Sequence, residues 1–483
     1  MARLVRAGAA TASALFGAAL LLPSSAAAHG LAAKADLPIP VWLFIWAAAI
    51  VLIVSFVILS VAWRRPLMQE EHTRPAPGWL SKALLNPVTE AIAGALGVFL
   101  LGVVIYAGLE GIDAPDLNVA VIFVFVTFFL GGVLFSILFG DFFRAFNPWR
   151  AIGRFFGGVV RLVSGQQAPA PLAYPERLGH WPAVIGLVAF GWLELIYGVG
   201  SVGVSPQDVA VATLIYSGIT LTAMALFGVE TWTDRGETFS VYFNMFSRLS
   251  PVTVEDGRLA FRRPLTGAPQ WGDVPCSLGL VLTSIAVTTF DGAQEGTLSG
   301  AINTVFDFFR DDLGLSIALS FRVTDTIFIL IVIAAVTGLF RLGLWGMHTV
   351  RDSPSVSELG RLFAHTMIPI SLAYMFAHYF SYFIYLEQAQ FTYLLSDPLG
   401  RGSDLFGTAQ SGVDLTLLSA NDIWYAQVAS LIVGHVTALA LAHDRAIAIW
   451  KDPALATRSQ YWMLAVMVGF TTLGLGLLSD ANG

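Results

Sequence analysis

The chain has 483 residues, of which 56% are hydrophobic and only 12% charged, and its mean hydropathy is +0.72. Soluble domains carry about 25% charged residues, and disordered chains are poor in apolar ones, so both classes are excluded. The net charge of −7 argues against a nucleic-acid partner, and a single cysteine, Cys276, excludes intrachain disulfides and cysteine-based metal sites. The expected partner is therefore the lipid bilayer.

The N-terminus has the pattern of a secretory signal peptide. Arg3 and Arg6 precede an apolar run over residues 7–22, and Pro23, two serines and three alanines follow. We expect residues 1–28 to be removed, which leaves His29 as the mature N-terminus outside the cytoplasmic membrane; an uncleaved anchor helix is the alternative. A mature N-terminal histidine could hold copper through its amine and imidazole, but an ordinary junction residue is the favoured interpretation of His29.

Residues 29–483 are predicted to form one all-α, polytopic membrane domain. A spanning helix needs about 20 mostly apolar residues, and ten further stretches approach this length. They are residues 41–63, 91–109, 117–140, 181–199, 209–229, 276–290, 323–342, 362–386, 424–442 and 461–478. The sixth stretch is the least apolar. With the mature N-terminus outside, alternation also places the C-terminus outside.

The charge distribution supports this topology. Twenty of the chain's 26 lysines and arginines fall in the predicted inner loops, as the positive-inside rule requires of a bacterial inner-membrane protein. Two inner segments mix arginines with aromatic residues, and both are predicted to be helices at the lipid headgroups: Pro148–Val163 and Thr238–Leu249. An outer loop, Ser396–Thr408, is rich in turn residues. It could be a lid that places Arg401 over an anion, or a tightly folded connector.

Ionisable side chains within the spans are the candidate functional residues, because charges in a membrane are costly and usually functional. The outer half holds a group that could converge at one level. We predict that His378, His435, Asp325 and Asp291 bind a metal, with Glu387 or Glu194 as base. Zinc, iron or manganese would suit imidazole and carboxylate ligands, and such a metal could activate water or polarise a phosphoryl oxygen.

The depths of the two histidines carry this prediction. At 1.5 Å per residue, His378 is about 12 Å and His435 about 16 Å from the outer surface, on consecutive antiparallel helices. We expect the two rings to lie within reach of one metal or one water. The alternative is a pair of buried histidines that only form hydrogen bonds. His365 and the pair His443–Asp444 lie near the inner surface and are predicted to be structural.

Several strings resemble a family of bacterial multi-span membrane proteins known as fenitrothion hydrolases. They include F-N-P-W-R-A from Phe146, A-Y-P-E-R-L-G-H-W-P from Ala173, G-E-T-F-S-V-Y-F from Gly236, T-T-F-D-G from Thr288, and G-H-V-T-A-L-A-L-A-H-D-R-A from Gly434. The resemblance covers nearly the whole mature chain. It implies hydrolysis of an organophosphorus triester, a small hydrophobic substrate and a second membrane subunit as partner. It supplies no catalytic residues.

Three functions remain open at this point. The first is a metal-dependent membrane hydrolase with a site open to the outer face. The second is a transporter or metal-handling protein, which predicts polar residues continuing to the inner face, with His365 and His443 extending the path. The third is a non-catalytic membrane subunit whose buried histidines only form hydrogen bonds.

Overall fold

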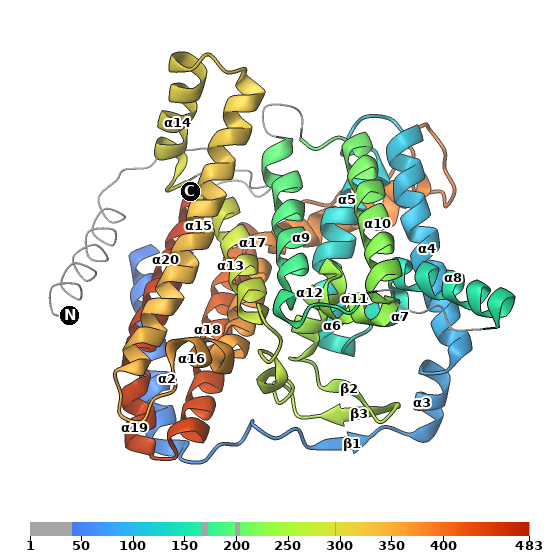
Figure 1. Cartoon of the computed structure of the whole chain (residues 1–483). Helices are drawn as coiled ribbons and strands as arrows, with labels where there is room; N and C mark the ends of the chain where they lie inside the picture. The colour runs from blue at the N-terminus through green and yellow to red at the C-terminus, as the bar shows by residue number, and fades with distance from the viewer. Residues whose placement is uncertain (1–40, 166–171, 199–202, 295, 483) are drawn as a thin grey trace.

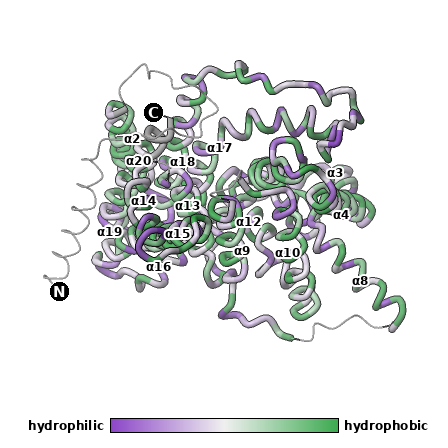
Figure 2. Tube along the Cα trace, turned by 90° about the horizontal axis from the view of Figure 1, so that it is seen from above, coloured by the Kyte–Doolittle hydropathy of each residue, from purple (hydrophilic) through white to green (hydrophobic). Residues whose placement is uncertain are grey.

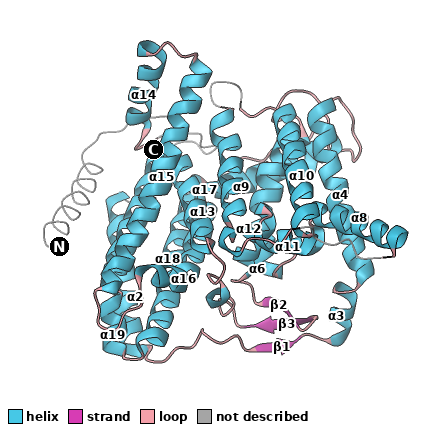
Figure 3. Ribbon diagram, viewed as in Figure 1, coloured by secondary structure: helices cyan, strands magenta, loops and turns pink. Residues whose placement is uncertain are grey.

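The fold is an all-α helical bundle with one small sheet at its end (Figures 1 and 3). The computed structural model describes residues 41–165, 172–198, 203–294 and 296–482; the predicted signal peptide and His29 lie outside these ranges. The first half contains α2 (Val41–Ala62), β1 (Thr73–Pro75), α3 (Gly78–Leu84), α4 (Pro87–Glu110), α5 (Val119–Ile122), η1 (Phe123–Leu130), α6 (Gly131–Phe139), α7 (Phe143–Phe146), α8 (Pro148–Ser164), η2 (Glu176–Leu178), α9 (Trp181–Trp192), η3 (Leu193–Tyr197), α10 (Pro206–Phe227), α11 (Val229–Arg235) and α12 (Thr238–Ser247).

The second half begins with the other two strands. It contains β2 (Val252–Glu255), β3 (Arg258–Arg262), η4 (Ala268–Gln270), α13 (Ser277–Gln294), α14 (Ser299–Asp307), η5 (Phe308–Asp312), α15 (Ile317–His348), α16 (Val356–Phe363), η6 (Ala364–Met367), α17 (Ile368–Ala389), η7 (Gln390–Leu394), α18 (Ala420–Trp450), α19 (Pro453–Ser459) and α20 (Tyr461–Asn482).

Each of the ten stretches predicted to span the membrane is helical. Within the described residues, eight continuous helical segments are long and apolar enough to cross a bilayer; α13 falls outside this set, and α20 contributes a shorter apolar helix, Tyr461–Gly476. Large apolar side chains of α2 are exposed on the surface of the bundle, where lipid would cover them: Trp46 is 63% and Val61 62% exposed. The chain therefore has the architecture of a multi-pass membrane protein.

The helix α13 lies at the centre of the bundle, which explains its lower hydropathy. It packs against α9, α15, α17 and α20, and most of its side chains are buried, including Ser284 and Thr288. A helix enclosed by protein does not need an apolar surface for lipid, so it can carry hydroxyl groups that find partners on its neighbours. This central position brings Asp291, near the end of α13, among the other candidate residues.

Of the two helices predicted to lie at the lipid headgroups, α8 is exposed and α12 is buried. Helix α8 is amphipathic and projects away from the bundle in the view from above, with Phe155 and Leu162 exposed (Figure 2). The prediction for Thr238–Leu249 was wrong, because α12 is buried: Phe243 and Phe246 have no exposed surface. The aromatic residues of α12 pack in the bundle instead of entering lipid.

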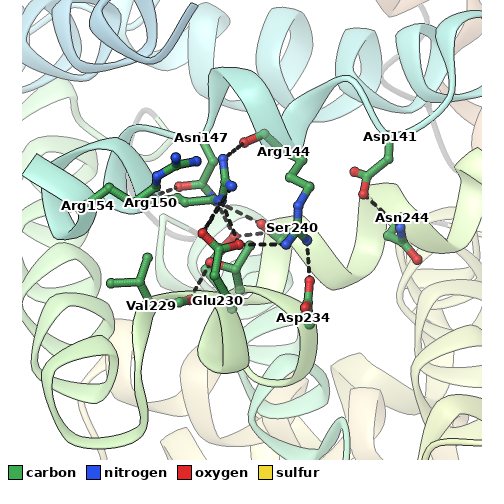
Figure 4. A network of polar contacts seen from close by, with 12 residues as sticks. Asp141, Arg144, Asn147, Arg150, Arg154, Val229, Glu230, Asp234, Ser240 and Asn244 are labelled. Atoms are coloured by element: carbon green, nitrogen blue, oxygen red, sulfur yellow. Dashed lines mark hydrogen bonds and ion pairs between the residues drawn. The ribbon is translucent and has the colours of Figure 1, made fainter. Parts of the chain in front are cut away.

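A polar network fixes α12 in this buried position. Glu237, which is fully buried, accepts hydrogen bonds from the Tyr216 hydroxyl, the Asn147 amide and the first backbone N–H groups of α12. Nearby, Arg150 forms an ion pair with Glu90 and another with Glu230; Figure 4 labels the second pair. The strings that begin at Phe146 and Gly236 therefore meet in space, where the cap residues of α8 and α12 bond to each other.

One end of the bundle, which we call the arginine-rich end, contains Arg144, Arg150, Arg248 and Arg262 and also carries the sheet. Its strands are antiparallel in the order β1-β3-β2, with Arg74 opposite Phe261 and Thr253 opposite Ala260. Asp444 on α18 fastens the segment after α2 to this end. Its carboxylate accepts from the Trp63 indole, the Gln69 amide and two backbone N–H groups.

Candidate functional site

Asp291 is the centre of a compact polar cluster near the C-terminal end of α13. One oxygen, Oδ2, lies 2.9 Å from Nε2 of His378 and accepts from the Tyr379 hydroxyl at 2.7 Å; the other accepts from the Gln294 amide at 3.1 Å. His378 and Asp291 are mostly enclosed, with side chains 24% and 16% exposed. A carboxylate that holds one imidazole nitrogen in this way fixes the ring and leaves its other nitrogen, Nδ1, for chemistry.

Glu194 joins this cluster from α9. Its carboxylate lies within electrostatic range of Asp291 and of the hydroxyls of Tyr379 and Tyr242. Glu194 lies in η3, a π-helical turn that continues α9. Such turns are rare and occur often at functional sites, because the extra residue redirects side chains that an α-helix would place elsewhere.

Glu387 is held on the other side of α17. It accepts a hydrogen bond from the Thr127 hydroxyl at 3.3 Å, and Thr127 belongs to a second π-helical segment, η1. A third, η7, begins at Gln390, three residues after Glu387. Two of the candidate carboxylates therefore lie in or beside π-helical turns, and sequence periodicity gave no signal for any of these turns.

A small cavity of about 30 Å³ adjoins the imidazole of His378. Its walls include Thr288, Gly292, Tyr374 and Leu431. At Gly292, a Cβ atom would lie at the ordinary van der Waals distance of 3.5 Å from Nδ1 of His378, so this nitrogen is on the side of the ring that faces Gly292. The volume is enough for one water molecule, which needs about 10–15 Å³, and it is far below the roughly 300–1,000 Å³ of a drug-sized ligand.

His435 lies beside the cluster and does not contact it. The ring is fully buried; Nδ1 is 2.7 Å from the carbonyl of Leu431, and Nε2 has no partner within the described residues. Tyr374 is a neighbour of both histidines, since it lines the cavity with His378 and its ring centroid lies 6.0 Å from that of His435. Gly434 lets α18 approach α17 closely at this point, as a Cβ there would clash with Ala373.

Asp325 is buried on α15 but remains separate from the cluster. Its side chain is 3% exposed, and no charged group among the described residues lies near enough to interact with it. Across those same residues, no group of three or more histidine, cysteine, aspartate or glutamate side chains is arranged to hold a metal ion. The structure thus joins Asp291, His378 and Glu194, and leaves Asp325, His435 and Glu387 outside their contacts.

Three hydroxyl groups contact one another at the middle of α13, between this cluster and the arginine-rich end, and the sequence analysis missed them. The Ser284 hydroxyl lies 3.1 Å from that of Tyr242 on α12 and 2.7 Å from that of Ser371 on α17. Along α13, Ser284 stands seven residues, or about 10 Å, from both Asp291 and Ser277. It is therefore midway between the two ends of the central helix.

Ser277 reaches a second and larger cavity of about 340 Å³ at the arginine-rich end. Polar and charged side chains line it, among them Asp141, Arg144, Ser240, Asn244 and Arg248. Burial raises the pKa of Asp141, which lies just after α6 and accepts a hydrogen bond from the Asn244 amide at 2.9 Å. None of these residues had been singled out, because only folding brings the loop after α6 to α12.

His443 and the loop Ser396–Thr408 are held by structural contacts. His443 lies 3.1 Å from both the Trp63 carbonyl and the Gln460 amide, while His365 is fully buried with both ring nitrogens unpartnered in the described part of the chain. Arg401 donates to the backbone carbonyl of Glu110, and Asp397 accepts from the Ser403 hydroxyl, so the loop Ser396–Thr408 is tied down at the end of α4. These contacts fit a folded connector.

Comparison of the chain with protein-family models, curated proteins and solved structures found no match. The function is therefore inferred from the Asp291 cluster and from the larger cavity at Ser277.

Proposed function

We propose that this protein is a membrane transporter that moves protons along α13, between the Asp291 cluster and the cavity at the arginine-rich end. The observation that carries the proposal is the Asp291 carboxylate, which accepts from His378, Tyr379 and Gln294 beside a cavity of the size of one water. Buried acid, imidazole and phenol groups in series are the usual constituents of proton relays in transporters.

The first step of such a relay follows from the contacts of His378. Its Nδ1 faces the small cavity and accepts a proton from water there, while the proton on Nε2 passes to the Asp291 carboxylate. Tyr379 stabilises the charged form of the carboxylate by donating to the same oxygen. Glu194, within electrostatic range of Asp291, is the next acceptor.

The hydroxyl chain supplies the continuation toward the opposite face. Tyr242 lies within electrostatic range of Glu194, and its hydroxyl bonds to Ser284 at mid-helix. Hydroxyl groups both accept and donate, so they can pass a proton without holding a charge. From Ser284 to the large cavity at Ser277 the proposed route crosses about 10 Å along α13, and water is the carrier that we propose for this interval. This route replaces the one through His365 and His443 expected for a transporter.

A flux measurement tests the proposal. Purified protein is reconstituted in vesicles that contain a pH-sensitive dye, and an inward proton gradient is imposed with the membrane potential clamped. Wild-type vesicles should acidify faster than empty ones, and Asp291→Asn, which keeps the shape but cannot ionise, should lower this excess rate at least tenfold. Equal rates for wild-type and empty vesicles would contradict the proposal.

A second candidate function is the hydrolysis of an organophosphorus ester. The Asp291–His378 pair favours it, since a carboxylate-oriented imidazole beside a water-sized cavity is also the arrangement that activates water for attack, and the family resemblance points the same way. The cavity of about 30 Å³ weighs against a bulky triester at this site. Release of nitrophenol from an aryl phosphotriester, lost in His378→Asn, would favour hydrolysis.

A further inference from the structure

The larger cavity has the size and the polarity of a ligand site. Its volume of about 340 Å³ lies within the range of small-molecule sites, roughly 300–1,000 Å³. Its walls come from the segment after α6, from His180 just before α9, from α11 and α12, and from the segment that leads into α13, so five parts of the chain line it. The ligand class follows from the charges in these walls.

Arg248 is the cation whose charge is least compensated. Its guanidinium donates from Nε and Nη2 to the Asn244 amide oxygen, a neutral acceptor, and it forms no ion pair within 4.0 Å in the described residues. Burial and the nearby Arg262 lower the pKa of Arg248. Arg262 itself is paired with Glu71 at 2.8 Å. A buried cation with a second cation beside it is a favourable place for an anion.

Three carboxylates act on Arg248 electrostatically, but only from beyond the ion-pair distance of 4.0 Å: Asp141, Glu71 and Asp234. Arg144 and Asp234 pair with each other, as Figure 4 shows. Asp273 is within electrostatic range of Arg445. Burial raises the pKa of Asp141, and its carboxyl oxygen is already engaged as the acceptor of the Asn244 amide at 2.9 Å.

The remaining walls supply a donor and a flat apolar surface. The Ser240 hydroxyl oxygen accepts from the Asn147 amide at 2.8 Å, which leaves its O–H to donate. His180 stacks on Trp271 with ring centroids 5.1 Å apart and planes at 23°. The cavity thus combines cationic and neutral donors with an aromatic wall.

We propose that this cavity binds a small solute with a carboxylate or phosphate group, held by Arg248 and Ser240. Binding depends on the cavity alone, whereas its role as the solute carried with protons rests on the proposed function. A soluble solute and a lipid headgroup could both supply the anionic group. The two sources are distinguished by testing soluble anions in detergent and an anionic lipid in nanodiscs.

Calorimetric titration of the purified full chain tests the site. Inorganic phosphate and succinate are titrated at constant ionic strength, with chloride as the reference anion. We expect phosphate or succinate to bind saturably to one site and chloride not to. If both soluble probes fail and phosphatidylglycerol alone binds in an Arg248-dependent way, the anion is a headgroup. Absence of specific binding by all three probes would overturn the proposal.

Three variants localise the binding. Arg248→Gln should weaken it at least tenfold, and Ser240→Ala should weaken it several-fold; the second variant serves if the first does not fold. The matched control is Arg351→Gln, because Arg351 is an arginine with an 85% exposed side chain away from the cavity. Unchanged affinity in both cavity variants would overturn the assignment. Saturable binding with no proton flux would refute only the proposed function.

Discussion

The substitution Tyr242→Phe removes one oxygen from the centre of the proposed path. The ring of Tyr242 stacks on Phe129 at 5.2 Å and meets Phe246 edge-on at 5.1 Å, and phenylalanine retains both contacts. Ser284 loses one partner but keeps Ser371. The cost to stability should therefore be about 1 kcal/mol, the usual net value of one hydrogen bond.

The effect of Tyr242→Phe on proton flux should be larger. Without the hydroxyl, the path has a gap between Glu194 and Ser284. We expect the flux in dye-loaded vesicles to fall at least tenfold, which corresponds to about 1.4 kcal/mol in the barrier. Tyr385→Phe is the matched control, because this equally buried hydroxyl bonds only to backbone carbonyls away from α13. Wild-type flux in Tyr242→Phe would refute the path through α12.

Three other predictions concern the arginine-rich end. Burial raises the pKa of Asp141 in the folded state above its ordinary value of 3.8, so the free energy of unfolding should fall as pH rises above 3.8. Asp141→Asn should remove this decline in thermal unfolding scans. Arg150→Lys should lower the free energy of unfolding by about 2 kcal/mol, because an ammonium cannot pair with Glu90 and Glu230 at once; an unchanged melting curve would contradict this. Cys276 is partly buried just before α13, so maleimide should label the folded chain more slowly than the unfolded chain at pH 7; equal rates would contradict this.

The helices were predictable because lipid exposure imposes long apolar runs on α2, α4, α10 and α15. The burial of α12 was not, because phenylalanine and tyrosine beside arginine suit a lipid interface and a packed core equally well. What decides between them is Glu237, which α12 shares with distant Asn147 and Tyr216. Only the folded chain reveals that contact.

The sequence indicated which helices carry the candidate site, but not how each helix is rotated about its axis. Counting residues placed His378 and His435 at similar levels, and their helices α17 and α18 do pack together. The count ignores the rotation of each helix about its axis, so it did not indicate that Tyr374 is a neighbour of both histidines. The π-helical turn at Glu194 changes the rotation of α9 as well, and no residue pattern marks it. The hydroxyls of Ser284 and Ser371 were missed because serine is common in buried helices.

The most direct test of the α13 path is the flux of the double variant Asp291→Asn with Tyr242→Phe, compared with both single variants in the same vesicles. If the two residues are links of one serial path, the double variant should conduct no more slowly than the slower single variant. If they act independently, the two reductions should multiply. Multiplied reductions, or full flux in either single variant, would contradict a single path from Asp291 to the cavity at the arginine-rich end.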